Sequence, residues 1–116
     1  MSNKRTGRMP PGNPGIVADR SGGLCEVCLV MPASDIHHRR FLSRGGKHNL
    51  ANLLHLCGTG NIDGCHGRAH TGDALEGTAI SRFDLRPESD IAFMDMQGDL
   101  WLLDDAGSRK KWKEAA

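Results

Sequence analysis

All four cysteines and all six histidines of this 116-residue chain fall between residues 25 and 70. This clustering constrains the fold more than any other feature, because thiolates and imidazoles are the side chains that bind transition metals most readily. Their order allows two metal sites side by side. A site made of thiolates would hold the fold together, and a site made of imidazoles would leave coordination positions open for chemistry.

The cysteines form two pairs, one with the spacing C-x-x-C and one separated by a glycine-rich turn. Such turns can present two thiolates each to one tetrahedral zinc ion, although four buried free thiols are the alternative. An aromatic content of 4% leaves little material for a large core, and chains with thin cores are commonly stabilised by a metal. We therefore expect one structural Zn²⁺ bound by Cys25, Cys28, Cys57 and Cys65.

Three histidines have the spacing of a second site. His66 and His70 lie four residues apart on a helix predicted from 64 to 71, so both rings leave the same helix face. His37 lies on a strand predicted over 33–41 and can supply a third ligand. The alternative is three ordinary surface or core histidines, but the spacing favours one divalent cation with open positions for water and a phosphate oxygen.

His38 follows His37 directly and, on a regular strand, points to the opposite face. An imidazole without a metal and with an ordinary pKa of about 6.5 can accept a proton from water at neutral pH. His38 is therefore the candidate general base. The pattern assigns no role to His48 or His55.

The order of these residues resembles the HNH endonuclease family, and within it the small HNH proteins of phages. Three runs carry the resemblance, which covers about half of the chain: Asp35-Ile36-His37-His38-Arg39-Arg40, Asn52-Leu53-Leu54-His55-Leu56-Cys57 and Cys65-His66-Gly67-Arg68-Ala69-His70. One departure is visible, because seven residues separate Cys57 from Cys65 where many members of the family have two or three.

The resemblance implies a ββα-metal finger that hydrolyses DNA phosphodiester bonds. It places the divalent cation (Mg²⁺, Mn²⁺, Ni²⁺ or Zn²⁺) on positions matching His37, His66 and His70, and the general base on His38. Asn52 is the middle letter of the motif, and His66 counts among the catalytic residues. The Asn52 amide can either hold a loop or orient the His38 ring, whereas outside the motif it would be only a turn residue.

Four arginines near these runs are candidate phosphate contacts, because a guanidinium matches the geometry of phosphate oxygens. Each could instead be a solvated surface side chain. They are Arg39, Arg40, Arg44 and Arg68.

The sequence predicts an α+β chain in three parts. Residues 1–23 are basic and rich in glycine and proline, which favours a disordered tail. Residues 24–72 hold the two predicted metal sites, with a second strand near 52–56. Residues 73–116 carry a predicted β-hairpin formed by 91–96 and 100–103, and we expect this extension to pack on the core.

Charge is divided unevenly: residues 1–48 carry eight Lys/Arg and three Asp/Glu, and residues 49–116 carry seven and eleven. This asymmetry suggests a polyanion approaching from one side, with chance clustering as the alternative. No apolar run has the length of a signal peptide core or a membrane span. We expect a cytoplasmic monomer without membrane contact, located in the host cell if phage-encoded, with DNA as partner and a phage terminase as a further candidate partner.

Two other functions remain open from the sequence. The chain could be a non-catalytic zinc-ribbon module that binds DNA, or an accessory factor of a DNA-packaging complex. A pure binding module needs no general base, and it would not explain adjacent His37 and His38 together with His66 and His70.

Overall fold

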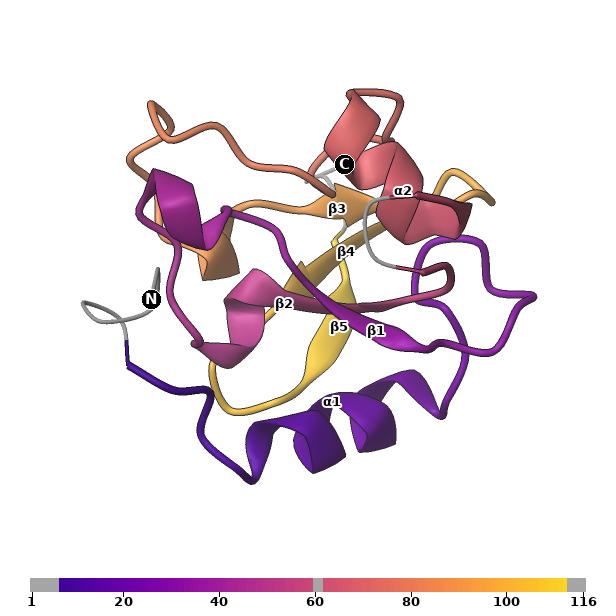
Figure 1. Cartoon of the computed structure of the whole chain (residues 1–116), viewed down its shortest axis with the longest axis horizontal. Coiled ribbons are helices and arrows are strands. Elements are labelled where there is room, and N and C mark those ends of the chain that lie inside the picture. Colours follow the sequence, from indigo (N-terminus) through magenta and orange to yellow (C-terminus); the bar gives the residue numbers. More distant parts are fainter. Residues whose placement is uncertain (1–6, 60–61, 113–116) are drawn as a thin grey trace.

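The computed structural model describes residues 7–59 and 62–112. This part of the chain is α+β, as predicted, with two α-helices and two small antiparallel sheets. In Figure 1 helix α1 lies along the bottom, the strands cross the middle and α2 lies at the top right. Among the described residues, no helix combines the length and apolar character that crossing a membrane requires.

The first sheet joins β1 (Asp35–His38) and β2 (Leu53–Leu56), which run antiparallel. Both predicted strands are confirmed, but each is shorter than predicted. Short 3₁₀ helices, η1 (Leu42–Arg44) and η2 (Leu50–Asn52), occupy part of the connection between them. The register places His37 opposite Leu54 and thereby fixes which faces the β1 side chains present.

Strand β2 is covered on both faces, which explains its nearly continuous run of leucines. Leu53 packs with Val17 of α1 on one face. Leu54 and Leu56 belong to the main core cluster on the other face. Because side chains alternate along a strand, this arrangement fixes the register against a slip of one residue.

Helix α1 (Asn13–Ser21) corrects the prediction of a disordered tail over residues 1–23. The helix has a proline in its first turn and ends at Gly22, whose φ of 65° is the left-handed conformation that suits a helix C-cap. Val17 is fully buried. Residues 1–6 of the predicted tail lie outside the described residues.

Arg20, expected in the disordered tail, instead forms a buried ion pair with Glu26. Its guanidinium donates two hydrogen bonds to the Glu26 carboxylate, at 2.7 and 3.0 Å, and one to the Leu53 carbonyl at 2.6 Å. The two charged side chains are 1% and 0% exposed. This paired charge fixes α1 against β2 and the segment that begins with Cys25.

The predicted helix from 64 to 71 is confirmed as α2 (Gly64–Thr71). The predicted hairpin is also confirmed, as β3 (Phe93–Met94) and β4 (Leu100–Leu103), and a third strand, β5 (Arg109–Lys111), continues the sheet. A further 3₁₀ helix, η3 (Glu88–Asp90), precedes β3.

The main core cluster contains cysteines from both pairs together with side chains from the C-terminal extension. Phe93 and Leu103 of the extension are 0% and 1% exposed in this cluster. The remaining members come from residues 25–65: Cys25, Val27, Ala51, Leu54, Leu56, Cys57 and Cys65. The cysteine site and the apolar core are therefore one continuous interior.

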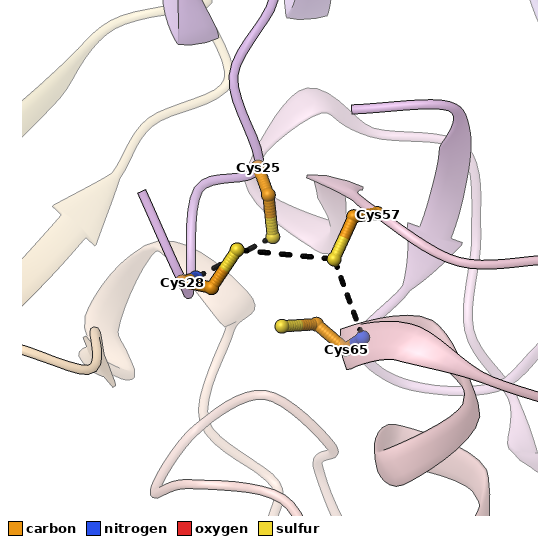
Figure 2. Close-up of side chains that lie close together, drawn as sticks. All are labelled: Cys25, Cys28, Cys57 and Cys65. Carbon is orange, nitrogen blue, oxygen red and sulfur yellow. Dashed lines mark hydrogen bonds between the residues drawn. The ribbon is translucent and has the colours of Figure 1, made fainter. Parts of the chain in front are cut away.

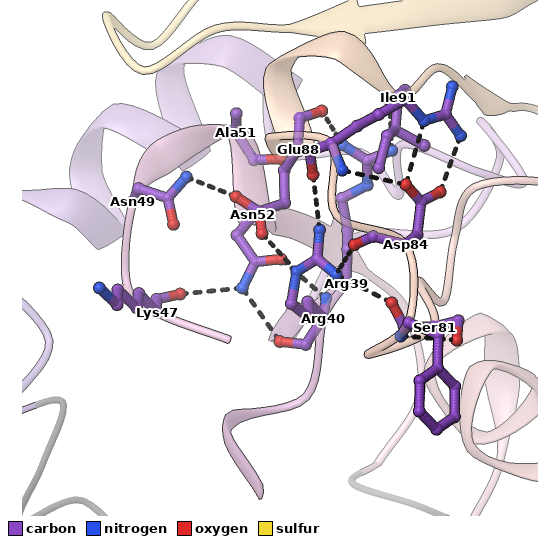
Figure 3. A network of polar contacts seen from close by, with 12 residues as sticks. Arg39, Arg40, Lys47, Asn49, Ala51, Asn52, Ser81, Asp84, Glu88 and Ile91 are labelled. Atoms are coloured by element: carbon purple, nitrogen blue, oxygen red, sulfur yellow. Dashed lines mark hydrogen bonds and ion pairs between the residues drawn. The ribbon is translucent and has the colours of Figure 1, made fainter. Parts of the chain in front are cut away.

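Arg39 corrects a second prediction, because it is fully buried and is no phosphate contact. Its guanidinium donates hydrogen bonds of 2.5 to 3.1 Å to four backbone carbonyls, those of Ala51, Gly77, Glu88 and Ile91. Burial lowers the pKa of Arg39 to about 10, so the side chain remains charged at neutral pH. Figure 3 shows it at the centre of this network.

Arg40 likewise faces inward, and its prediction as a phosphate contact is wrong for the same reason. It pairs with Glu88 at 2.7 Å and donates to the carbonyls of Ser81, Asp84 and Arg86. Both arginines follow the two histidines of β1, so the strand that carries His37 and His38 is tied to the C-terminal extension (Figure 3).

Candidate functional site

The four cysteines meet at one point. Their sulfur atoms all lie within 4.8 Å of one another, and the Sγ atoms of Cys28 and Cys57 are 3.8 Å apart. A tetrahedral zinc site with Zn–S bonds of about 2.3 Å would place neighbouring sulfurs about 3.8 Å apart. All four are free thiols. Figure 2 shows them converging from two separate turns, and this donor set could hold a metal ion.

The first turn is tight around Cys25. The backbone N–H of Cys28 points at the Cys25 sulfur with an N···S distance of 3.4 Å, and the N–H of Leu29 donates to the Cys25 carbonyl at 3.0 Å. Leu29 has a φ of 65°, a conformation that few side chains other than glycine adopt. The turn thus keeps strained backbone at the point where two sulfurs are brought together.

In the second turn, the seven-residue segment 58–64 connects Cys57 to Cys65, and two glycines bring its two ends together. Gly58 has a φ of 109°, and a Cβ atom there would lie 2.1 Å from the carbonyl oxygen of Asp63. A Cβ atom on Gly64 would lie 2.6 Å from the Gly58 Cα. The backbone N–H of Cys65 consequently reaches the Cys57 sulfur at 3.5 Å. The seven residues between Cys57 and Cys65 therefore do not separate their sulfurs.

The thiols differ in how readily they ionise. Burial raises the pKa of Cys57 and of Cys65, and the nearby Cys25 raises both further. Burial also acts on Cys28, but hydrogen bonds from the backbone of Met31 and Val30 and from neighbouring thiols lower its pKa to about 7. A bound cation would offset the repulsion between buried thiolates, so these residues fit a metal.

The second predicted cluster also forms. His37, His66 and His70 each offer one ring nitrogen, and these atoms all lie within 4.8 Å of one another. The Nε2 atoms of His66 and His70 are 3.2 Å apart. His37 comes from β1 and the other two from α2, so the strand and the helix together build this site.

Outer partners aim the imidazoles of this cluster. The Nε2 of His37 donates to the Thr78 carbonyl at 2.9 Å, which leaves Nδ1 as the bare nitrogen of the neutral ring. The Nδ1 of His66 lies 2.9 Å from a carboxylate oxygen of Asp35, so its Nε2 faces His70. Partners of this kind commonly orient the histidines that bind metals.

Two of the rings, those of His37 and His70, are also held uncharged, as metal ligands must be. Burial lowers the pKa of His37 to about 3, and the neighbouring His66 and His70 lower it further. Burial and the neighbouring His66 also lower the pKa of His70. Three imidazole nitrogens that meet at one point, two of them on uncharged rings, fit a divalent cation.

Phe41 and Arg44 form one wall beside His70. The guanidinium of Arg44 lies 4.9 Å from the centre of the Phe41 ring, which in turn packs on His70. Arg44 and Arg68 are both exposed, so two of the four predicted phosphate contacts face solvent. The sequence carried no signal for Phe41, because a single phenylalanine at the end of a predicted strand has no distinguishing spacing.

His38 lines the same hollow as the three clustered histidines, a space of about 450 Å³. It stands outside the group of ligand atoms, as the alternation along β1 predicted. Burial lowers the pKa of His38 to about 4, and the neighbouring His48 and His66 contribute. The ring is therefore neutral at physiological pH and can accept a proton, but it is a weaker base than the ordinary imidazole expected from the sequence.

Asn52 holds a loop, which is one of the two roles considered for it. Its side-chain oxygen accepts the Arg40 N–H at 2.7 Å, and its amide donates to the carbonyls of Arg40 and Lys47 at 3.1 and 2.9 Å. The amide is thus taken up by the chain that leaves β1 and does not orient the His38 ring within the described contacts (Figure 3).

His48 is a site residue that sequence reasoning left without a role. Its Nδ1 lies 3.0 Å from the Nε2 of His38, and only 8% of its surface is exposed. The nine residues between the two histidines carry no periodic signal. His55 lies on β2 and faces α1, where its Nδ1 is 2.7 Å from the Ser21 hydroxyl.

No protein-family model, curated protein or solved structure matches this chain. The side chains and their geometry are therefore the basis for assigning a function.

Proposed function

We propose that this protein is a metal-dependent HNH endonuclease that hydrolyses DNA phosphodiester bonds. One observation carries the proposal: three imidazoles converge on a hollow that a fourth imidazole, outside the group of ligand atoms, also lines. The order β1, β2, α2 is consistent with a ββα-metal finger, in which the first strand and the helix supply the ligands.

We propose two ions with different tasks. Cys25, Cys28, Cys57 and Cys65 would hold a structural Zn²⁺, because a closed set of four thiolates suits that ion. His37, His66 and His70 would hold a single divalent cation. That cation would neutralise the charge that develops on the phosphate and assist the leaving oxygen.

The protein's own groups would act as follows. His38 would take the proton from the attacking water, since its ring is neutral and faces the hollow. Arg44, held on the Phe41 ring at the edge of the hollow, is the phosphate contact that the geometry favours most. Arg68 is exposed and remains a second candidate. Asn52 would act indirectly by holding the loop after β1.

The test is cleavage of supercoiled plasmid by the purified protein with Mg²⁺, Mn²⁺ or Ni²⁺, and with a chelator. We expect cleavage that depends on the cation and falls roughly 10²- to 10⁴-fold in His38→Ala. His55→Gln is the matched control, because the His55 ring contacts Ser21 of α1 and does not line the hollow, so this variant should cleave like the wild type.

DNA binding without cleavage under every cation would instead identify a zinc-ribbon binding module and overturn the enzyme proposal. Cleavage that appears only when a phage terminase is added would identify the accessory factor of a packaging complex.

A further inference from the structure

We propose that His48 is a positioning residue that fixes the ring of His38 with its proton on Nε2 and its lone pair on Nδ1. This inference extends the proposed function and rests on it only for the activity part of its test. The hydrogen-bond chain that carries it can be followed without any assumption about the reaction.

The chain of hydrogen bonds begins at the Gly7 carbonyl, which can only accept a hydrogen bond. The carbonyl oxygen of Gly7 lies 3.0 Å from the Nε2 of His48. A carbonyl accepts hydrogen bonds and cannot donate them, so the Nε2 of His48 must carry a proton. In the neutral ring the other nitrogen, Nδ1, is then a bare acceptor.

The same reasoning applies one ring further on. The Nδ1 of His48 lies 3.0 Å from the Nε2 of His38, and the ring centres are 5.1 Å apart. With both rings neutral, the His48 Nδ1 is the acceptor, so the Nε2 of His38 is the donor. The lone pair of neutral His38 is thus left on Nδ1. The hydrogen bond to the Gly7 carbonyl therefore sets the tautomer of His48, and through it the tautomer of His38.

The burial of His48 favours its ring over water as the partner of His38. His48 is 8% exposed, so few water molecules can replace it as the partner of the His38 Nε2–H. A buried N–H without an acceptor is costly, which favours the ring position and tautomer that keep the bond. His48 would thereby hold the His38 ring in one orientation and reserve Nδ1 for a proton from water.

The inference also gives the segment before α1 a place in the active site. Gly7 lies in the stretch predicted to be a disordered tail, yet its carbonyl accepts the first hydrogen bond of the chain that leads through His48 to His38. Its φ of 74° is the left-handed conformation that favours glycine.

The test compares two substitutions of the same residue. His48→Leu is close in size but has no acceptor, whereas the Oδ1 of His48→Asn falls near the position of the imidazole Nδ1. Long-range ¹H–¹⁵N NMR at neutral pH reports which nitrogen of each histidine is protonated, and it needs neither DNA nor activity. Zinc content and thermal unfolding would be measured in parallel to confirm that each variant is folded.

In the wild type we expect one tautomer for His38, protonated on Nε2, and the same tautomer for His48. His48→Leu should lose the protected Nε2–H signal of His38. Its cleavage rate should fall about 10-fold or more, but by less than the roughly 10²- to 10⁴-fold expected when the base itself is removed. His48→Asn should restore both the signal and most of the cleavage.

A wild-type spectrum with His38 protonated on Nδ1 would overturn the inference, as would unchanged cleavage in a folded His48→Leu. If the wild type cleaves no DNA, the proposed function fails, but the NMR spectra still decide whether His48 sets the tautomer.

Discussion

The rings of Phe41 and His70 lie nearly parallel, with centres 4.7 Å apart and planes inclined by 21°. This stack bears on metal binding, because His70 is half of the helix pair that would hold the divalent cation and is itself exposed to solvent. Phe41 therefore limits the rotation of the His70 ring.

Replacing Phe41 by Ala should therefore weaken binding of the divalent cation. A stacked aromatic pair contributes about 0.5 to 1.5 kcal/mol, which corresponds to a loss of roughly 2- to 10-fold in affinity. Calorimetric titration with Ni²⁺ measures the effect, and Phe41→Tyr, which keeps the ring, should bind like the wild type. Equal affinity in all three proteins would show that the stack does not position His70.

Removing the proposed structural zinc should unfold the domain, because three of its four ligands are part of the main core cluster. We expect one tightly bound zinc per chain and a loss of far-ultraviolet circular dichroism in strong chelator. Cys28→Ser should behave like the chelated protein. A chain that contains no zinc and stays folded in chelator would rule out this role.

Loss of His66 should separate the two metal sites. His66→Ala removes an imidazole that is aimed by Asp35, but it leaves all four thiols in place. The variant should keep one zinc by elemental analysis, remain folded and lose plasmid cleavage. Release of zinc together with unfolding would place His66 in the structural site instead.

Arg39 and Arg44 should respond in opposite ways, since one is buried and the other exposed. Arg39→Met leaves buried carbonyls without a donor and should lower the free energy of unfolding by at least about 3 kcal/mol. Arg44→Ala should change it by less than about 0.5 kcal/mol and yet reduce cleavage. Urea denaturation and plasmid cleavage distinguish the two, and a stable Arg39→Met would contradict the structural role.

The lowered pKa of His38 predicts how stability depends on pH. The unfolded state binds a proton near pH 6.5 and the folded state only near pH 4, so stability is fully present above about 6.5 and declines as the pH falls toward 4. His38→Gln should lose less stability than the wild type between pH 7 and 5. The comparison by denaturant unfolding at each pH removes contributions shared by both proteins.

Local spacing was sufficient for the residues that meet at the two clusters. His66 and His70 could be placed on one face because a helix repeats every 3.6 residues, and the cysteine pairs because each lies in its own turn. Neither inference needed the tertiary fold.

Local spacing could not predict that the side chains of Arg20, Arg39 and Arg40 point into the protein. A basic side chain after two histidines reads as a surface residue, but the carbonyls that receive Arg39 come from residues 51 to 91. Only the folded chain brings those acceptors together. Helix α1 was missed for a related reason, since Val17 is its one buried apolar side chain and the pairing of Arg20 with Glu26 follows no local pattern.

The close approach of Gly58 and Gly64 has a consequence for how this chain could be altered. Since the two backbones meet at the base of the segment 58–64, the separation of the Cys57 and Cys65 sulfurs is set at the base and not by the number of residues beyond it. A side chain at either glycine would thus be expected to push the two backbones apart, and with them the sulfurs that would share a metal ion.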